Sequence, residues 1–372
     1  MYSDPISRSI DFNRGVGSGR AKIVDIFDAP TLAFPRSLPE FQRLFPDDAA
    51  CAVYLEKIRW PQGFVCPSCS EAGAPARIST RPTVLRCRKC RAEARLTAGT
   101  VMQDSHTPLS TWFWGAYLLT SLIPGMSAVQ FQRQLGLKRY ETSFQILHKL
   151  RSGMVRHDRD RIGTKAIPVE VDETYIGGRT RGEGKGTHHK TLVAAAVEIR
   201  TRKPKEKDIF GEQSKAIPRR GGRYAGRLRL SVVSARTAKQ LTAFVQRSVE
   251  PGTMVVTDDW AGYDGLGGLG YEHLQVAEKG DPKVAEEYLP LVHLIFSNLK
   301  TWLLGVHHGV SPQHLQAYLN EFTFRFNRRF YPFNAFRSLL GIGAGSESPT
   351  YEELYSGNWE HPNPTGITTH GG

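Results

Sequence analysis

The chain has 372 residues, which is enough for two or three domains with sizeable hydrophobic cores. Its 49 Lys and Arg residues outnumber its 36 Asp and Glu residues, which gives a formal net charge of +13 at pH 7. This excess favours a polyanionic partner such as nucleic acid, although some basic enzymes have none. No apolar run is long enough for a transmembrane helix, and the N-terminus lacks the apolar stretch of a signal peptide. The sequence therefore predicts a cytoplasmic protein without a membrane partner.

Four of the five cysteines form two CxxC pairs separated by seventeen residues: Cys66 and Cys69, then Cys87 and Cys90. Two residues between thiols allow one tight turn to present both sulfurs to a single ion, and two such turns complete a tetrahedral site. The spacing predicts one structural zinc, because four cysteine ligands leave no position for water or substrate. A redox-active dithiol and cysteines without metal are the alternatives. Arg88 and Lys89 are candidates for phosphate contact, with a solvated basic surface as the alternative.

The segment that follows has the apolar repeats of helices. Ser127 is the expected N-cap of a helix that reaches Leu135, and a second helix is expected from about Tyr140 to Arg151. Two helices joined by a glycine-containing turn have the outline of a helix-turn-helix motif. An ordinary helical hairpin between domains is the alternative. The basic residues that are candidates for DNA contact are Lys138, Arg139, Lys149 and Arg151.

After Gly163 the pattern changes to strands, expected over 168–176, 191–199, 228–233 and 254–257, with a helix over roughly 238–249. The order is strand, strand, strand, helix, strand, which indicates an α/β core. Between the second and third strands, residues 200–229 hold eleven Lys or Arg residues against three acids. We interpret this basic insertion as a clamp on the DNA backbone, and a solvated hairpin is the alternative.

Two acidic residues lie where a strand exposes them. Asp172 lies within the first strand, and Asp258 directly follows the apolar strand over 254–257. Carboxylates on adjacent strands can share divalent cations, and two such ions support phosphoryl transfer by activating the attacking oxygen and stabilising the leaving one. A single strand-end Asp usually belongs to a turn, but two in this strand order favour a metal site. Glu173 is assigned to the opposite strand face as a structural residue, and Asp259 is the alternative to Asp258.

Several ordered motifs carry a family resemblance. The segments VDETYIGG, TDDWAGYDGLGGLGYEH and FSNLKTWLLGVHHGVSPQHLQAYLNEFTFRFNRR, preceded by FPDDAACAVYLEKIRWPQGFVCPSC, resemble insertion-sequence transposases of the insertion sequence 1595 family. The likeness covers roughly residues 35–335. It implies a DDE-class transposase with an RNase-H-like fold, in which Asp172 and Asp258 bind the catalytic metal.

The resemblance also points to His293 and Lys300. The third metal ligand of the family is often Glu or Asn, placed four residues before the serine of the FSNLK-like stretch, and this chain has His293 there. A basic residue follows seven positions later, at Lys300 on the same helix face. A neutral imidazole suits Mg²⁺ less well than a carboxylate does, so Mn²⁺ is the alternative metal. Other readings give the third ligand to Glu286 or Glu287, or leave His293 without a ligand role.

The resemblance therefore implies a multidomain α+β protein, with a zinc ribbon and helix-turn-helix before an α/β RNase-H-like core with a mixed sheet. Its function would be to bind terminal inverted repeats, to cleave DNA with two Mg²⁺ or Mn²⁺ ions, and to join the freed 3′-hydroxyl to target DNA. Its main partner would be double-stranded DNA at the nucleoid. The protein would act there as a homodimer or larger assembly. The rivals are a catalytically impaired DNA-binding derivative and an RNase-H-like nuclease without strand transfer.

The expected organisation is a mobile arm over 1–34, a helical lead-in and zinc ribbon over 35–105, a helix-turn-helix segment over 106–160, the core over 161–340 and a loosely ordered tail over 341–372. The residues expected to contact DNA are Arg88, Lys89, Lys138, Arg139, Arg219, Arg220, Arg223, Arg328 and Arg329.

Overall fold

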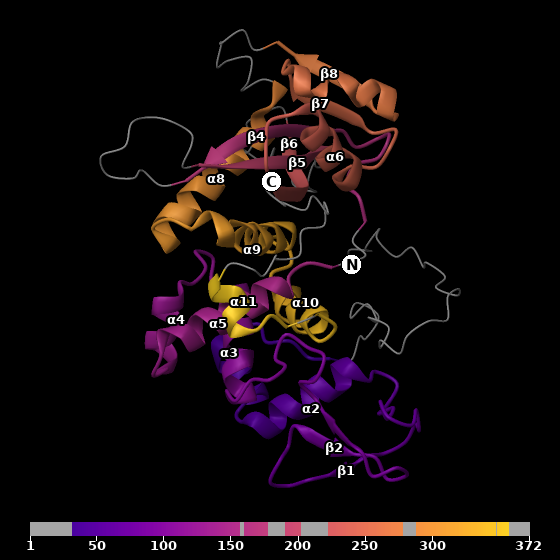
Figure 1. Cartoon of the computed structure of the whole chain (residues 1–372), viewed down its shortest axis with the longest axis vertical. Helices are drawn as coiled ribbons and strands as arrows, with labels where there is room; N and C mark the ends of the chain where they lie inside the picture. The colour runs from indigo at the N-terminus through magenta and orange to yellow at the C-terminus, as the bar shows by residue number, and fades with distance from the viewer. Residues whose placement is uncertain are drawn as a thin grey trace, which may run out of the picture.

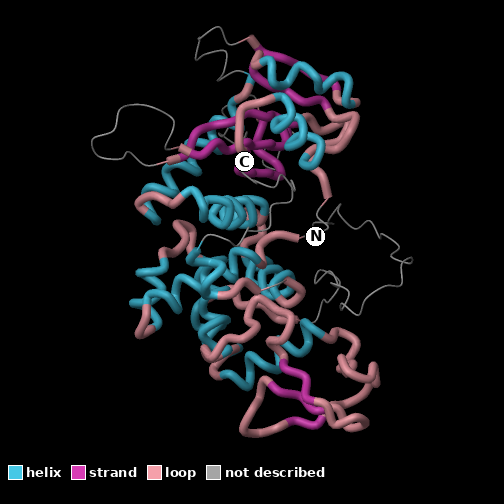
Figure 2. Tube along the Cα trace, in the orientation of Figure 1, coloured by secondary structure: helices cyan, strands magenta, loops and turns pink. Residues whose placement is uncertain are grey.

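The computed structural model describes residues 32–156, 160–177, 190–201, 222–277, 288–346 and 348–356. Most of the expected N-terminal arm, most of the basic insertion and the end of the tail lie outside these residues, as do Arg219 and Arg220. Figure 1 shows an elongated molecule with a five-stranded sheet at one end and the small strands β1 and β2 at the other. Helices fill the middle between the two sheets (Figure 2).

The N-terminal part combines a small antiparallel sheet with five helices. Its elements are α1 (Leu38–Leu44), α2 (Asp48–Arg59), β1 (Ala76–Arg77), β2 (Val84–Arg86), β3 (Glu93–Arg95), α3 (Leu109–Ser121), α4 (Ala128–Leu135) and α5 (Tyr140–Ser152). The expected helix pair is confirmed: Ser127 Oγ accepts a hydrogen bond from the Gln130 amide at 3.2 Å, and Gly136 ends α4 with φ of +60°. Apolar residues of this part share one hydrophobic core, which includes Phe41, Phe113 and Phe131.

The second part is built on a mixed sheet in the order β6-β5-β4-β7-β8. Its elements are β4 (Val169–Ile176), β5 (Thr191–Thr201), β6 (Arg223–Val233), α6 (Ala238–Ser248), β7 (Met254–Asp258), the 3-10 helix η2 (Ala261–Leu269), β8 (Glu272–Val276), α8 (Pro290–His307), η3 (Pro312–His314) and α9 (Leu315–Asn327). Strands β4, β5 and β6 pair antiparallel, whereas β4–β7 and β7–β8 pair parallel. The expected order of three strands, a helix and a strand is confirmed.

Both faces of this sheet are covered. On β5, Val193, Ala195 and Val197 pack toward α8 and α9, while Leu192, Ala194 and Ala196 pack toward α6 and η2. Burial on both faces explains why the sequence of β5 is continuously apolar rather than alternating. The same alternation on β4 directs positions 170, 172 and 174 toward α8 and position 173 toward α6 and η2.

The two parts meet at α9. Leu315 and Leu319 of α9 belong to the core under the sheet, whereas Phe324 belongs to the core of the N-terminal helices. Across this junction Arg151 Nε donates to Glu321 Oε2 at 2.8 Å, and the two side chains are 1 % and 0 % exposed. Such burial requires the two charges to stay paired.

The chain then returns to the N-terminal part. Helix α10 (Phe333–Gly343) contributes Phe336 and Leu339 to the core of the N-terminal helices, and α11 (Tyr351–Ser356) buries Leu354. The loose tail expected from residue 341 is therefore wrong for 341–346 and 348–356, because apolar side chains among its Gly and Ser residues pack onto α3 and α5. No helix in the described part of the chain is long and apolar enough to cross a membrane.

Candidate zinc and catalytic sites

The four paired cysteines converge on one point. Their sulfur atoms all lie within 4.8 Å of one another, with Cys66 Sγ 3.6 Å from Cys90 Sγ and Cys69 Sγ 3.7 Å from Cys87 Sγ. A tetrahedral zinc with bonds of about 2.3 Å would hold its sulfurs about 3.8 Å apart. The cysteine cluster therefore has the dimensions of a structural zinc site.

Two similar turns create this cluster. In each turn the fourth residue after the first cysteine is in the left-handed region, with φ of +58° at Ser70 and +62° at Arg91, and its amide donates to the carbonyl of that cysteine. Cys66 and Cys87 are buried in the N-terminal core, while Cys69 and Cys90 are exposed. The site consequently links the surface of the ribbon to the core beneath it.

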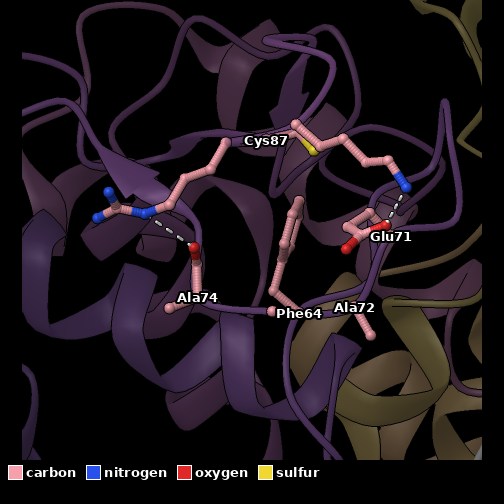
Figure 3. Close-up of a pocket in the computed structure, with 8 residues that line it drawn as sticks. Phe64, Glu71, Ala72, Ala74 and Cys87 are labelled. Atoms are coloured by element: carbon pink, nitrogen blue, oxygen red, sulfur yellow. Dashed lines mark hydrogen bonds and ion pairs between the residues drawn. The ribbon is translucent and has the colours of Figure 1, made fainter.

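Arg88 and Lys89 lie on the surface of the second turn beside a small pocket that Phe64 and Cys87 also line (Figure 3). Arg88 Nε donates to the Ala74 carbonyl at 3.1 Å, and Lys89 Nζ pairs with Glu71 at 2.6 Å. Both side chains are exposed, so these weak contacts leave them accessible to a phosphate.

The second helix of the pair is exposed at its N-terminal end and buried over most of its length. Lys138 and Arg139 are exposed at the start of α5, but nine of its thirteen residues are buried. Lys149 donates to the Gln103 carbonyl at 3.4 Å, and Arg151 holds the buried pair with Glu321. The interpretation of Lys149 and Arg151 as DNA contacts is therefore wrong, because α9, α10 and α11 cover the end of α5 that carries them.

The residues expected at a catalytic site meet between β4 and α8. Successive side chains on one face of β4 contact α8 in order. Glu170 accepts from the Leu291 and Val292 amides at 2.8 Å, Asp172 Oδ2 is 3.2 Å from His293 Nε2, and Lys300 Nζ donates to Thr174 Oγ1 at 2.8 Å. Leu289 at the N-cap of α8 supplies no side-chain hydrogen bond, so Glu170 caps the helix from the strand. This series of contacts sets the rotation of α8 and brings His293 to Asp172.

Asp258 is next to Asp172 across the parallel pair of β4 and β7. The register pairs Val169 with Val255 and Glu170 with Val256. Each aspartate lies two residues further along its strand, and the two are close enough for the charge of Asp172 to act on Asp258. Burial raises the pKa of Asp258, and the charge of Asp172 raises it further. A second negative charge close by favours a bound cation, and carboxylate oxygens are the ligands that hard divalent cations take.

An arginine that the sequence did not single out completes this centre. Arg236 pairs with Glu173 through Nε and with Asp258 Oδ2 through Nη2 at 3.1 Å, and Tyr263 Oη donates to Glu173. Glu173 does lie on the opposite face from Asp172, as expected, yet through Arg236 it is connected to Asp258. The position of Arg236 in a turn before α6 gives no motif that would have identified it.

In the described part of the chain, only the four cysteines form a group of three or more His, Cys, Asp or Glu residues with all ligand atoms within 4.8 Å of one another. Asp172, Asp258 and His293 are neighbours but do not meet this criterion. The oxygens of both aspartates are engaged by protein groups: Asp172 also accepts from the Glu173 amide at 2.7 Å, and Asp258 from the Trp260 amide at 3.3 Å.

The remaining basic candidates make internal contacts. Arg328 lies over the Phe324 ring at 3.8 Å, and Arg329 lies over Phe326 at 3.8 Å while donating to the Phe326 and Ala225 carbonyls. Both arginines are half-buried, and the contact of Arg329 with the Ala225 carbonyl joins the end of α9 to β6. Arg223 begins β6 and is also half-buried.

Comparisons with known proteins give the same division into two regions. The transposase zinc-ribbon domain matches residues 46–93, and the ISXO2-like transposase domain matches residues 166–327. A protein of Halobacterium salinarum, described as an uncharacterized protein in transposable element ISH50, is 22% identical over 287 residues, which cover 76% of this chain and 92% of that protein. No solved structure matches the chain. The two matched segments contain the cysteine cluster and the strands that carry Asp172 and Asp258, and they confirm the predicted resemblance to transposases of the insertion sequence 1595 family.

Proposed function

We propose that this transposase binds the terminal inverted repeats of an insertion sequence and performs DNA cleavage and strand transfer in an RNase-H-like core. The observation that carries the proposal is the convergence of Asp172, Asp258 and His293 from three separate elements, β4, β7 and α8. Polar residues that converge from different elements are typical of an assembled reaction centre. The raised pKa of Asp258 supports the same view, since burial of closely spaced acids is costly for the fold.

Asp172, Asp258 and His293 would hold the divalent cations. Bound there, such cations would lower the pKa of an attacking water or 3′-hydroxyl and stabilise the leaving oxygen. The side chains of the protein supply the positioning: Asp172 and Asp258 fix two ligand positions on adjacent strands, and the cap from Glu170 fixes α8 and hence His293.

Lys300 would bind a backbone phosphate of the DNA. It lies about two turns after His293 on α8, and burial together with the charge of Lys190 lowers its pKa. The shift means that a further anion is favourable at this position, because it would offset the repulsion from Lys190. Its present acceptor, Thr174, is neutral and would yield readily to a phosphate.

DNA would also contact the zinc ribbon and the exposed start of α5. Arg88, Lys89, Lys138 and Arg139 are all exposed. In helix-turn-helix proteins the N-terminal residues of the second helix contact base edges, and this is the end of α5 that remains open. Binding of two element ends implies a dimer or larger assembly on DNA.

The test uses a supercoiled plasmid that carries the gene with its native flanking DNA, incubated with the full-length protein and Mg²⁺ or Mn²⁺. Cleavage at the element ends and joining of those ends to a second plasmid are expected. Asp172→Asn and Asp258→Asn should each reduce cleavage by at least about 10²-fold while leaving DNA binding unchanged. Cleavage that survives in both variants would refute the site, and binding without cleavage by the wild-type protein in either metal would favour the impaired DNA-binding rival.

The role of His293 has its own test. His293→Glu supplies the carboxylate that the family resemblance implies at this position, and it should raise activity with Mg²⁺ relative to Mn²⁺. His293→Ala should lose activity with both metals. Equal activity of the wild type and His293→Ala would remove His293 from the site.

A further inference from the structure

Arg236 lies in the turn between β6 and α6, and its side chain reaches the inner strands β4 and β7, which carry Asp172 and Asp258. Its guanidinium touches three groups at once: the carboxylate of Glu173, the carboxylate of Asp258 at 3.1 Å, and the ring of Trp260, whose centre is 4.2 Å from Cζ. These contacts come from β4, β7 and the turn after β7. The arginine is thus fixed in place by the same strands that carry the two aspartates.

The support beneath Arg236 is buried. The Glu173 side chain is 2 % exposed, and Tyr263, which donates to the same carboxylate, is 0 % exposed. A buried carboxylate needs a paired cation, and Arg236 supplies it through Nε. Because Glu173 and Trp260 already fix the long side chain, little further conformational entropy is lost when the guanidinium binds another group.

The outer part of the guanidinium remains accessible. The side chain is 34 % exposed, and Nη1 has no hydrogen-bond partner within the described ranges of the chain. A guanidinium presents several N–H donors in a planar fork that matches phosphate oxygens. A phosphodiester that reacts at Asp172 and Asp258 must lie close to Arg236, because its guanidinium contacts Asp258 directly.

We propose that Arg236 is a further catalytic residue, which donates hydrogen bonds to a non-bridging oxygen of the reacting phosphate and offsets the charge that develops there. The proposal rests on the proposed function of the acidic centre. In phosphoryl transfer this charge spreads over the equatorial oxygens, where fixed cationic donors have their largest effect. The alternative is that Arg236 serves only as the counter-ion of Glu173. The experiment must distinguish this structural role from a catalytic one.

The first measurement compares cleavage of the plasmid by Arg236→Gln and by Arg247→Gln at saturating Mn²⁺. Arg247 is exposed on α6, and its replacement removes the same charge from the protein. Arg236→Gln should reduce the cleavage rate by about 10²- to 10³-fold, whereas Arg247→Gln should stay close to the wild type. If Arg236→Gln leaves Glu173 unpaired and the protein unfolded, the double variant R236Q/E173Q removes both charges of the pair and serves in its place.

The second measurement tests contact with the phosphate directly. Duplexes that carry the element end are made with sulfur in place of either non-bridging oxygen at the cleaved phosphate, and the ratio of the two cleavage rates is determined. Arg236→Lys, which keeps the charge but loses the fork, should change this ratio relative to the wild type. A structural role would lower both rates equally and leave the ratio unchanged, which would overturn the proposal.

Failure of the proposed function would be seen separately. It would appear as retained cleavage in Asp172→Asn or as no cleavage by the wild type, and it would overturn the role of Arg236 as well. Full activity of Arg236→Gln beside an inactive Asp172→Asn would overturn the role of Arg236 alone.

Discussion

The cysteine site and the acidic centre differ in how the chain assembles them. The four cysteines occupy two short turns of one small sheet, and their sulfurs already have the spacing of a tetrahedral site. The acidic centre draws Asp172, Asp258 and His293 from β4, β7 and α8, and protein donors engage the oxygens of both aspartates. Local turn geometry determines the cysteine site, whereas the packing of strands and helices around the five-stranded sheet determines the acidic centre.

The two sites also differ in what they do for stability. Cys66 and Cys87 belong to the N-terminal core, so metal binding there supports the fold. The acidic centre instead buries carboxylates, and burial raises the pKa of Glu170, Glu173 and Asp258. Each ionised group therefore opposes folding at neutral pH. Metal binding at the cysteine site therefore stabilises the fold, whereas the buried carboxylates of the acidic centre destabilise it.

Removal of zinc should have the largest effect. In zinc-finger peptides the metal contributes about 10–16 kcal/mol of apparent binding free energy, which is available to folding. Cys87→Ser should therefore abolish the one zinc per chain measured by atomic absorption and unfold the ribbon, seen as loss of amide protection from β1 to β3 in hydrogen exchange. Because the sheet from β4 to β8 has cores of its own, its protection should persist.

The control for that experiment is Cys51→Ala. Cys51 is buried in the same core but lies outside the cluster. It should lower stability without changing the zinc content. Loss of protection in β4 and β5 after zinc removal would contradict the independence of the two regions.

The Arg151–Glu321 pair tests how firmly the two regions are joined. Glu321→Gln leaves Arg151 buried without its full counter-charge, which should cost about 3–5 kcal/mol of unfolding free energy in chemical denaturation. The exposed pair of Lys89 and Glu71 is the control, and Glu71→Gln should leave the denaturation midpoint unchanged. An equally small effect of Glu321→Gln would mean that the two parts fold without this contact.

The sequence predicted the elements of both sites because their signals are local. The CxxC spacing identifies the cluster, and the apolar strands before Asp258 and around Asp172 identify two positions on a sheet. The parallel register that makes these aspartates neighbours is a tertiary feature. Only the family resemblance linked them to His293, and the 3.2 Å contact with Asp172 agrees with that link.

The errors arose where packing overrides composition. Lys149 and Arg151 look like surface cations on an amphipathic helix, yet α9, α10 and α11 cover the end of α5 that carries them. The sequence alone could not identify Arg236, because a single arginine in a turn belongs to no motif. Its significance comes from its tertiary contacts with Glu173, Asp258 and Trp260. Long-range partners of this kind leave no periodicity in the sequence.

The free energy that burial of a carboxylate takes from the fold can be measured at Glu170 by varying the pH. Burial raises its pKa from 4.5 to about 7, against the opposing effect of the Val292 and Leu291 amides. Below pH 4.5 the folded and unfolded states both carry the proton, but between pH 4.5 and 7 the unfolded state loses it first. Stability should therefore fall by about 3 kcal/mol as the pH rises through this window, and Glu170→Gln should remove that slope. The measurement is the free energy of unfolding from urea titrations at several pH values.

A flat pH profile in the wild type would show that Glu170 stays ionised in the folded protein, held by the α8 amides. Asp160→Asn is a suitable control, since Asp160 is an exposed acid of the same part of the chain. Its pH profile should follow that of the wild type.

The smallest effect on stability should come from Asp258→Asn, although this variant should reduce cleavage by at least about 10²-fold. Neutralising Asp258 removes a charge that burial and Asp172 disfavour, but it also weakens the contact with Arg236, whose side chain is one-third exposed. These changes oppose each other, so the free energy of unfolding should move by no more than about 1 kcal/mol. Thermal unfolding beside the cleavage assay measures both quantities on one preparation. Loss of cleavage with unchanged stability would establish Asp258 as a residue kept for chemistry, whereas a large loss of stability would place it with the cysteines, among the residues that hold the fold together.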